Sequence, residues 1–301
     1  MADLDWSHDD TLIYDLGMHT GLDAKFYLDK GFRVVALEAN PRACAAAREE
    51  LSAHGDRLTV VEAALWERGG EAATFHINER ESSWSSLDES LAARRKDALT
   101  PVEVPTVTLT DLFDRHGVPR YAKCDVEGAD DLFVEQLAAE RRRPAFASIE
   151  ATREASAALR QLKGAGYDRV QMVNQTFHPS VKVPEVSREG ERVEVRFQLH
   201  MSGLFGLDLP RGRWIEFDEA IALYEAFVTM RQARVGITRG WVDFHVTTAR
   251  QLNRPSPVLP ARGPVREPAR EPVREPAREP VAAVNAGSKG GGGLLGRFRR
   301  S

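Results

Sequence analysis

Two glycines and two carboxylates near the start of the chain have the spacing of a ligand-binding turn. The segment YDLGMHTG (14–21) places Asp15, Gly17 and Gly21 at the end of a short apolar run that predicts a buried strand. A glycine turn between a strand and a helix lets the backbone approach a ligand closely. Glu38 ends the next predicted strand, twenty-one residues after Gly17. A carboxylate at that spacing can accept the hydroxyls of an adenosine ribose.

This spacing differs from that of phosphate-binding turns. A dinucleotide turn would have glycines at positions 19 and 22, which hold His19 and Leu22, and a triphosphate loop would have Lys after Gly21. Asp15 would repel a phosphate but suits a cationic ligand. The segment therefore predicts a nucleoside site without phosphate. S-adenosylmethionine fits, because it has a ribose diol and a sulfonium but no phosphate.

A second charged segment, KCDVEGAD, covers residues 123–130. Lys123, Asp125 and Glu127 alternate along a predicted strand end and so share one side. Three charges on one side of a buried strand indicate either a functional cluster or an internally paired structural one.

Strands and helices alternate around these segments. We expect strands at 11–17, 32–41, 57–65, 102–109, 120–128, 144–151, 167–174 and 241–249, with helices at 22–31, 42–55, 110–117, 129–143, 153–166 and 218–233. Residues 71–77 are expected to form a hairpin partner after the strand at 57–65, and residues 181–197 a second hairpin. Pro105 indicates that the strand at 102–109 lies at an edge, and Thr110 is the expected N-cap of the helix at 110–117. Such alternation predicts a parallel α/β sheet with ligands at the carboxyl ends of its strands.

The charge is unevenly distributed along the chain. Residues 254–301 hold ten Lys or Arg against four Glu, a net charge of +6, so residues 1–253 carry −10 of the overall −4. An acidic body argues against nucleic acid as a partner. A four-residue repeat with Pro, Arg and Glu runs from Pro264 to Pro280 and forbids a continuous helix. We expect one domain at 1–253 and a disordered tail at 254–301, either merely solvated or a weak docking motif for a protein or an anionic surface.

The cysteine content, the N-terminus and the lengths of the apolar runs bear on the cellular location of the protein. Cys44 and Cys124 are the two cysteines, which argues against a disulfide framework and against a cysteine-based zinc site. The N-terminus is acidic and has no apolar signal-like segment, and no apolar run approaches the ~18 residues of a membrane-spanning helix. The sequence predicts a cytoplasmic protein with no transmembrane segment.

A family resemblance rests on five segments in a fixed order. They are LIYDLGMHTGLDAKFYLDKGFRVVALEANP, VEAALWERGGEAATF, SSWSSL, VPTVTLTDLFDRHGVPRYAKCDVEGAD and FASIEA. Together they resemble the FkbM family of S-adenosylmethionine-dependent methyltransferases over residues 11–178. The sequence departs from the family pattern at GMHTG, where the commoner form is G-A-N-x-G. It also departs at Cys124 and Asp130, where the family has an aliphatic residue and Glu.

The resemblance implies a Rossmann-like, seven-stranded class I methyltransferase sheet with helices on both faces. It also implies S-adenosylmethionine as cofactor and methyl transfer to a hydroxyl of a sugar, glycan or natural product. Residues 179–253 would form a C-terminal extension of the domain.

The family's site residues carry over position by position. Asp15, Gly17, Met18 and Gly21 would lie at the methionine end of the cofactor, and Glu38 would hold the ribose with Asn40 in the same loop. Glu62 and Ala63 would lie near the adenine, and Asp125 and Glu127 would face cofactor and acceptor. Ser82 and Ser83 match a serine pair in a loop that would cover the site.

An alcohol acceptor needs a proton acceptor, because its own pKa is far above 7. Asp125 is the first candidate, followed by Glu127, His19, His178 and Glu150. The carboxylates could instead bind a divalent cation, although no spacing demands a metal. Two other functions remain open. One is a nicotinamide-dependent oxidoreductase on a similar sheet, and the other is a non-catalytic scaffold that recruits partners through the tail.

Overall fold

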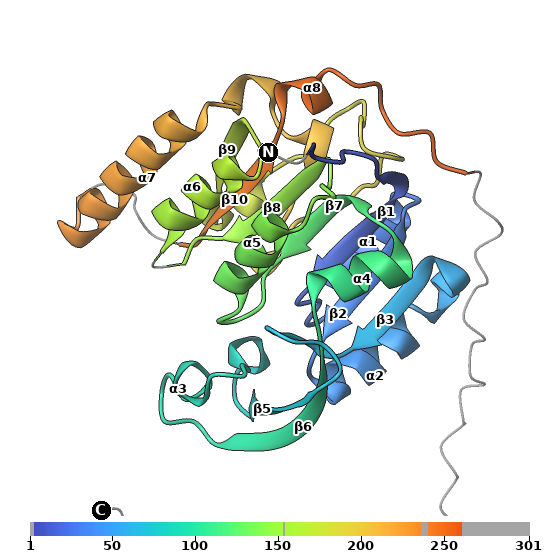
Figure 1. Cartoon of the computed structure of the whole chain (residues 1–301), viewed down its shortest axis with the longest axis vertical. Coiled ribbons are helices and arrows are strands. Elements are labelled where there is room, and N and C mark those ends of the chain that lie inside the picture. The colour runs from blue at the N-terminus through green and yellow to red at the C-terminus, as the bar shows by residue number, and fades with distance from the viewer. Residues whose placement is uncertain (1–2, 153, 236–239, 261–301) are drawn as a thin grey trace, which may run out of the picture. The chain divides into compact units, whose positions relative to one another are not determined.

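The computed structural model describes residues 3–152, 154–235 and 240–260, so most of the predicted tail (261–301) lies outside the described residues. Its central feature is a seven-stranded sheet in the order β3-β2-β1-β7-β8-β10-β9 (Figure 1). The strands are β1 (Asp9–Leu16), β2 (Arg33–Glu38), β3 (Leu58–Glu62), β7 (Pro119–Cys124), β8 (Phe146–Glu150), β9 (Arg169–Asn174) and β10 (Val242–Thr247).

Helices connect most of these strands. The α-helices are α1 (Leu22–Asp29), α2 (Pro41–Glu50), α3 (Glu89–Ala92), α4 (Leu109–His116), α5 (Asp130–Ala139), α6 (Ala155–Gly164), α7 (Phe217–Gln232) and α8 (Ala249–Leu252). Short 3₁₀ turns are η1 (Ser52–Arg57), η2 (Ser82–Trp84), η3 (Gln175–Ser180), η4 (Gly206–Asp208) and η5 (Arg211–Arg213).

The sheet reverses its strand order at β1, which lies between β2 and β7. All three strands are parallel, and Leu16 at the end of β1 pairs with Leu37 on one side and Cys124 on the other. The carboxyl ends of β1, β2 and β7 therefore meet at one edge, where α/β sheets bind ligands. The parallel arrangement expected from the strand–helix alternation holds for β1, β2, β3, β7 and β8, whereas the last strand, β10, runs antiparallel to both β8 and β9.

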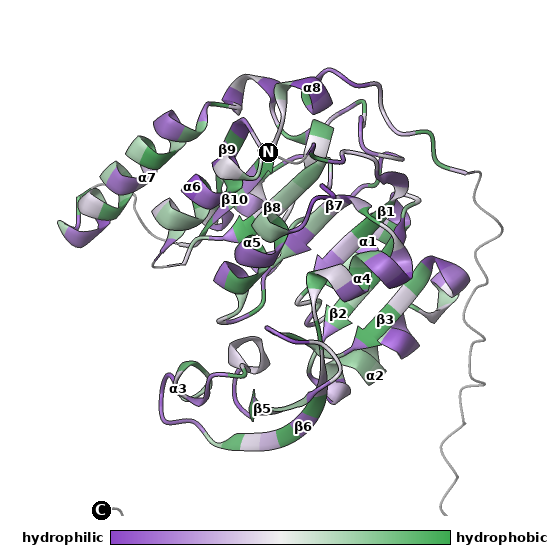
Figure 2. Cartoon of the chain, in the orientation of Figure 1, coloured by the Kyte–Doolittle hydropathy of each residue, from purple (hydrophilic) through white to green (hydrophobic). Residues whose placement is uncertain are grey.

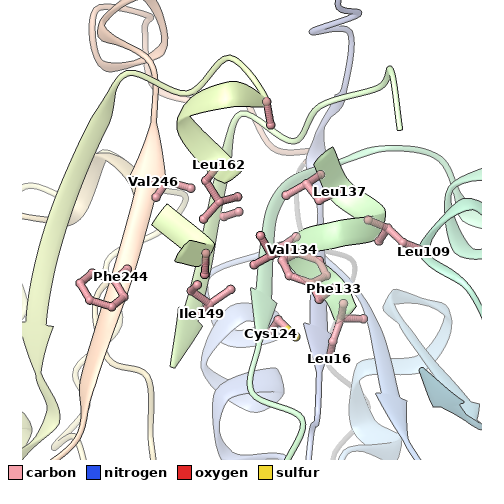
Figure 3. Close-up of a cluster of buried hydrophobic side chains, with 14 of the residues drawn as sticks. Leu16, Leu109, Cys124, Phe133, Val134, Leu137, Ile149, Leu162, Phe244 and Val246 are labelled. Atoms are coloured by element: carbon pink, nitrogen blue, oxygen red, sulfur yellow. The ribbon is translucent and has the colours of Figure 1, made fainter. Parts of the chain in front are cut away.

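Helices cover both faces of the sheet, as predicted. Alternate residues of β1 point to opposite faces, with Leu12, Tyr14 and Leu16 in one buried cluster and Ile13 in another. The first cluster includes side chains of α4, α5, α6 and α7, part of which is drawn in Figure 3. The second includes side chains of α1 and α2. In Figure 2 the helices carry hydrophobic and hydrophilic residues in alternation, as expected of elements with one buried side.

A small sheet in the order β4-β6-β5 lies between β3 and α4 in sequence. Its strands are β4 (Ala64–Leu65), β5 (Ala72–Asn78) and β6 (Leu99–Val107). Residues 71–77 form a strand as predicted, but β5 pairs with the later β6 and not in a hairpin with the strand before it, and β6 is the middle strand and not an edge. Pro105 is tolerated because β4 pairs only with Thr106 and Val107, which leaves Pro105 without a partner on that side.

Two local predictions are wrong for identifiable reasons. The N-cap of helix α4 is Thr108 and not the predicted Thr110, because Thr108 and Asp111 form a reciprocal capping box in which each side chain accepts the other's backbone N–H. Residues 181–197 form no hairpin. Their polar groups bond to the body of the domain, where the Glu191 N–H donates to the Lys30 carbonyl and Glu189 pairs with Arg120.

Buried ion pairs attach the extension after β9 to the rest of the domain. Lys30 Nζ lies 2.9 Å from Asp208 Oδ2, and Arg120 Nε lies 2.8 Å from Glu189 Oε2. The cysteines Cys44 and Cys124 are both free and buried. Among the described residues, no helix has the length and apolar character needed to cross a membrane.

Candidate active site

Two adjoining cavities open where the carboxyl ends of β1, β2 and β7 meet. The larger has a volume of about 410 Å³ and the smaller about 230 Å³. Residues common to both walls are Gly17, His19, Ser83, Asp125 and Glu127. Ligand sites are typically concave spaces of roughly this size, ~300–1,000 Å³. The shared wall lets one ligand extend from the larger cavity into the smaller.

The glycine turn after β1 forms part of that shared wall. Gly17 has φ +81°, and a Cβ placed there would lie 1.9 Å from the carbonyl oxygen of Asp125. Only glycine permits this approach, because any side chain would collide with the backbone after β7. The Gly17 and Met18 N–H groups donate to the Leu37 carbonyl, at 2.9 and 3.1 Å. The turn is therefore fixed against both neighbouring strands.

Glu38 at the end of β2 organises the same turn. Its Oε2 accepts the His19 N–H and its Oε1 accepts the Asn40 N–H, each at 2.7 Å. Burial raises the pKa of Glu38, although these two hydrogen bonds act in the opposite direction. Each carboxylate oxygen has a further lone pair. Glu38 lines the larger cavity, so it can accept hydroxyl groups of a ligand there.

His19 connects the turn to the loop that covers the site. Its φ is +48°, a region that costs a non-glycine residue energy, and the bond from its N–H to Glu38 offsets that cost. Its Nε2 lies 2.8 Å from Ser82 Oγ in η2. Burial lowers the pKa of His19. The neutral ring is therefore favoured in the free protein.

The larger cavity is suited to an uncharged or cationic nucleoside. Apolar side chains of β4 and β5 form one side, among them Leu65 and Phe75, and its carboxylates are Glu38, Asp88, Asp125 and Glu127. Among the described residues that line it, none is Lys or Arg. A phosphate would lack the cationic partners that it normally requires. The residues present thus fit a nucleoside with a positive charge and no phosphate.

Lys123 lies beneath the glycine turn and is 3% exposed. Its Nζ lies 3.0 Å from Asp15 Oδ1 and 3.9 Å from carboxylate oxygens of Asp23 and Asp125, and it donates to the Gly17 carbonyl. Burial alone would lower the pKa of Lys123, but the three carboxylates raise it well above the usual value. Lys123 therefore holds the turn in place. Of the two interpretations of the KCDVEGAD segment, the internally paired structural one applies to Lys123.

The smaller cavity extends from the shared wall toward β8 and β10. Loop residues form its rim, including Trp84, Arg94 and Trp241, of which Trp241 is 55% exposed. Arg94 forms an ion pair with Glu127. Glu150 and Gln175, from the ends of β8 and the start of η3, also line it. The cavity thus combines indole surfaces with hydrogen-bonding groups.

The structure brings most of the predicted site residues to these cavities. Gly17, Glu38, Ala63 and Asp125 line the larger cavity, and Met18 lines the smaller. Asp15 is buried beneath the turn, Gly21 ends the turn at the start of α1, and Asn40 caps α2 by accepting the Arg42 N–H. Glu62 pairs with Arg48 outside both linings. His178 is 1% exposed and is absent from both linings, so its predicted role has no contact that favours it.

Other lining residues were not predicted from the sequence. Among them are Trp84, Arg94, Gln175, Leu199, His200 and Trp241 of the smaller cavity. These six residues lie in loops or short 3₁₀ turns, which carry no periodic pattern that would place them. Among the described residues, no group of three or more His, Cys, Asp or Glu side chains is arranged to hold a metal ion.

The sequence matches the model of the methyltransferase FkbM domain over residues 15–169, slightly more than half of the chain. The chain belongs to the FkbM methyltransferase family. Its members are S-adenosylmethionine-dependent methyltransferases, so methyl transfer and this cofactor, both expected from the sequence, are supported. The matched residues include the glycine turn, Glu38 and Asp125. No curated protein matches the chain.

Several solved structures resemble this fold at low similarity. A precorrin-6y C5,15-methyltransferase from Geobacter metallireducens has 12% identity and a TM-score of 0.35, covering 81% of this chain and 82% of its own. A precorrin-8w decarboxylase from Methanobacterium thermoautotrophicum has 13% identity and a TM-score of 0.32, covering 82% and 84%. A SAM-dependent methyltransferase from Geobacter sulfurreducens, in complex with S-adenosyl-L-homocysteine, has 13% identity and a TM-score of 0.31, covering 81% and 86%.

Proposed function

We propose that this protein transfers a methyl group from S-adenosylmethionine to a hydroxyl of a sugar, a glycan or a natural product. The observation that carries the proposal is the pair of adjoining cavities. One suits a cationic nucleoside, and the other is lined by hydrogen-bonding groups and rimmed by indoles. Indole faces pack well against sugar rings and other largely apolar ring systems. Family membership favours this function over the nicotinamide-dependent alternative.

Each part of the cofactor has candidate partners in the site. The ribose hydroxyls would bind Glu38, and the adenine would lie against Ala63, with Glu62 and Asn40 supporting the same loops. The methionine end would lie along Gly17, Met18 and Gly21, above Asp15. Asp125 lines both cavities and would face cofactor and acceptor together.

S-adenosylmethionine supplies an electrophilic methyl group on a positively charged sulfur. The protein has to align the acceptor hydroxyl with that carbon and to take up the hydroxyl proton. Asp125, Glu127 and His19 line the shared wall and are candidates for contacts with the acceptor. A catalytic role for His178 remains a prediction, and His178 lines neither cavity.

Isothermal titration calorimetry with S-adenosylmethionine tests the cofactor site. The Glu38→Gln variant loses one oxygen that both organises the turn and faces the ligand, so we expect its Kd to rise at least tenfold, or ~1.4 kcal/mol. Glu50→Gln, at an exposed position at the end of α2, is the control and should bind like the wild type. Absence of detectable binding to the wild type would refute the proposal.

A screen with isotopically labelled methyl donor tests the acceptor. Sugars, glycans and hydroxylated natural products should become labelled at oxygen, as judged by mass spectrometry of the product. Label found only on nitrogen or carbon would refute O-methylation while leaving the family's activity intact. The cytoplasmic location remains a prediction, as does a tail that contacts a protein or an anionic surface.

A further inference from the structure

Glu150 is placed to act on an acceptor in the smaller cavity. It ends β8, one residue after the Cys124–Ile149 pair, and so lies level with Asp125 at the edge of the sheet. It lines the smaller cavity together with Gly17 and Asp125, which also line the larger one. Its carboxyl group therefore lies next to the wall between the two cavities, where the methyl group and the acceptor hydroxyl would meet.

Asp243 is the cross-strand neighbour of Glu150. The two residues are paired across the antiparallel strands β8 and β10, so their side chains lie on the same face of the sheet. Asp243 is 4% exposed, and its Oδ1 accepts a 2.7 Å hydrogen bond from Gln175 Nε2. Its Oδ2 has no hydrogen-bond partner among the described residues. The hydrogen bond between Gln175 and Asp243 thus fixes two side chains beside Glu150 at the wall of the smaller cavity.

Glu150 differs from the carboxylates of the shared wall, Asp125 and Glu127, in having no cation paired with it. Lys123 Nζ lies 3.9 Å from Asp125, and Arg94 pairs with Glu127. Within the described parts of the chain, the Glu150 side chain has neither a hydrogen bond nor an ion pair. Lys123 and Arg94 line the same cavity, but the charges that act most on Glu150 are the carboxylates Asp125, Asp243, Asp130 and Glu127. Burial, followed by these carboxylates, raises the pKa of Glu150 to about 10, and burial raises that of Asp243 well above the usual value.

We propose that Glu150 is the catalytic residue that accepts the proton of the acceptor hydroxyl, with Asp243 as its positioning residue. This inference rests on the proposed function. The step moves the hydroxyl proton to a Glu150 oxygen, forms the O–CH₃ bond with an oxygen lone pair and breaks the CH₃–S bond, whose electron pair remains on sulfur. Atoms and charge balance without a further reactant.

The charge of the donor prepares Glu150 for this role. The raised pKa favours the protonated form of Glu150 in the free protein, and a protonated carboxyl group cannot act as a base. A sulfonium bound beside it adds a positive charge, which lowers the pKa of Glu150 and releases the proton to solvent. A carboxylate whose pKa then lies near the working pH is a more effective base than an ordinary one. The product thioether is neutral and leaves Glu150 protonated.

Proton release on binding tests this inference without an acceptor. Calorimetric titration of the full chain in phosphate and in Tris at pH 7.5 gives the number of protons exchanged, with S-adenosylmethionine and with S-adenosylhomocysteine as the two probes. We expect the sulfonium to release more protons than the thioether. Glu150→Gln should abolish this difference, whereas Glu135→Gln, which removes an exposed carboxylate of α5, should retain it.

Further variants separate the two roles. Glu150→Asp keeps an ionisable group and should retain proton release, which covers the case in which Glu150→Gln fails to fold. Asp243→Asn removes a neighbour that raises the pKa of Glu150, so the release should decline at a lower pH than in the wild type. With an acceptor from the labelling screen, Glu150→Gln should lower kcat at least 100-fold, with the Kd for S-adenosylmethionine within about threefold.

The failures of the two proposals can be distinguished. If neither probe binds, the proposed function is wrong. If both bind with equal proton release in the wild type, or if Glu150→Gln keeps the difference or more than a tenth of kcat, the assignment of Glu150 is overturned and the proposed function stands. If Asp243→Asn leaves the pH dependence unchanged, its positioning role is overturned.

Discussion

Replacing Lys123 by Met should destabilise the fold strongly and in a pH-dependent manner. The substitution removes the cation shared by Asp15, Asp23 and Asp125. At 3.0 Å and an effective dielectric constant of ~20, the attraction to Asp15 alone is about 5–6 kcal/mol, from which the desolvation of Lys123 must be subtracted. Breaking a buried pair on one side typically costs ~3–5 kcal/mol, and we expect a loss in this range at pH 8.

The loss should shrink as the pH falls. Burial already raises the pKa of Asp15 and raises that of Asp23 to about 7, both above the unfolded value of 3.8. Removal of Lys123 raises both further. A group with a raised folded pKa contributes its full stability below its unfolded pKa and loses it as the pH rises through its folded pKa. The carboxyls of the variant are therefore tolerated when protonated, so the loss at pH 5.5 should be smaller than at pH 8.

Urea unfolding at both pH values measures the effect. Lys25→Met is the control, because Lys25 pairs with Asp29 at an exposed position of α1 and should lose less than ~1 kcal/mol. The double variant Lys123→Met/Asp15→Asn should regain part of the stability, since one buried charge is removed with its partner. A loss below ~1 kcal/mol at pH 8, or an equal loss at both pH values, would refute the description of Lys123 as the buried support of the turn.

Two further predictions concern the turn and the tail. Gly17→Ala should abolish binding of S-adenosylmethionine, because its Cβ would collide with the Asp125 carbonyl, whereas Gly70→Ala has a similar φ of +78° with no atom within 4 Å and should retain binding. Equal affinities of the two variants in a calorimetric titration would show that the collision at Gly17 does not control cofactor binding. A chain ending at Pro260 should bind the cofactor with unchanged affinity, because all residues lining the two cavities precede it. A tenfold weaker Kd would contradict the assignment of the site to the domain alone.

Periodic patterns predicted the sheet and most helices because they reflect burial. The strand that became β1 is a run of residues buried on both faces, and the helix that became α6 has one buried side. The prediction of a hairpin at 181–197 was wrong because Glu189 and Glu191 look like solvent-facing strand residues. In the structure Glu189 pairs with buried Arg120, and the Glu191 N–H donates to the Lys30 carbonyl. Such long-range partners leave no local pattern.

The candidate site was predictable where it depends on strand ends. Gly17 and Glu38 were found from their spacing, and both line the larger cavity. Lys123 was found as part of a charged cluster, but its structural role depends on the packing of β1 against β7, which the sequence does not display. Trp241 reaches the smaller cavity because β10 runs antiparallel to β8, which brings the residue before β10 to the carboxyl end of β8, and no local pattern in the sequence shows that direction.

The contacts beneath the glycine turn also order the assembly of the site during synthesis. Lys123 bonds to Gly17 across 106 positions of the chain, and Asp23 accepts the Ser202 N–H across 179. A nascent chain that has completed only β1, α1 and β2 holds the glycine turn and Glu38 but lacks the partners that fix their geometry. The turn therefore reaches its final geometry only after the chain through Ser202 has been made, so we expect tight cofactor binding to begin only after that point in synthesis.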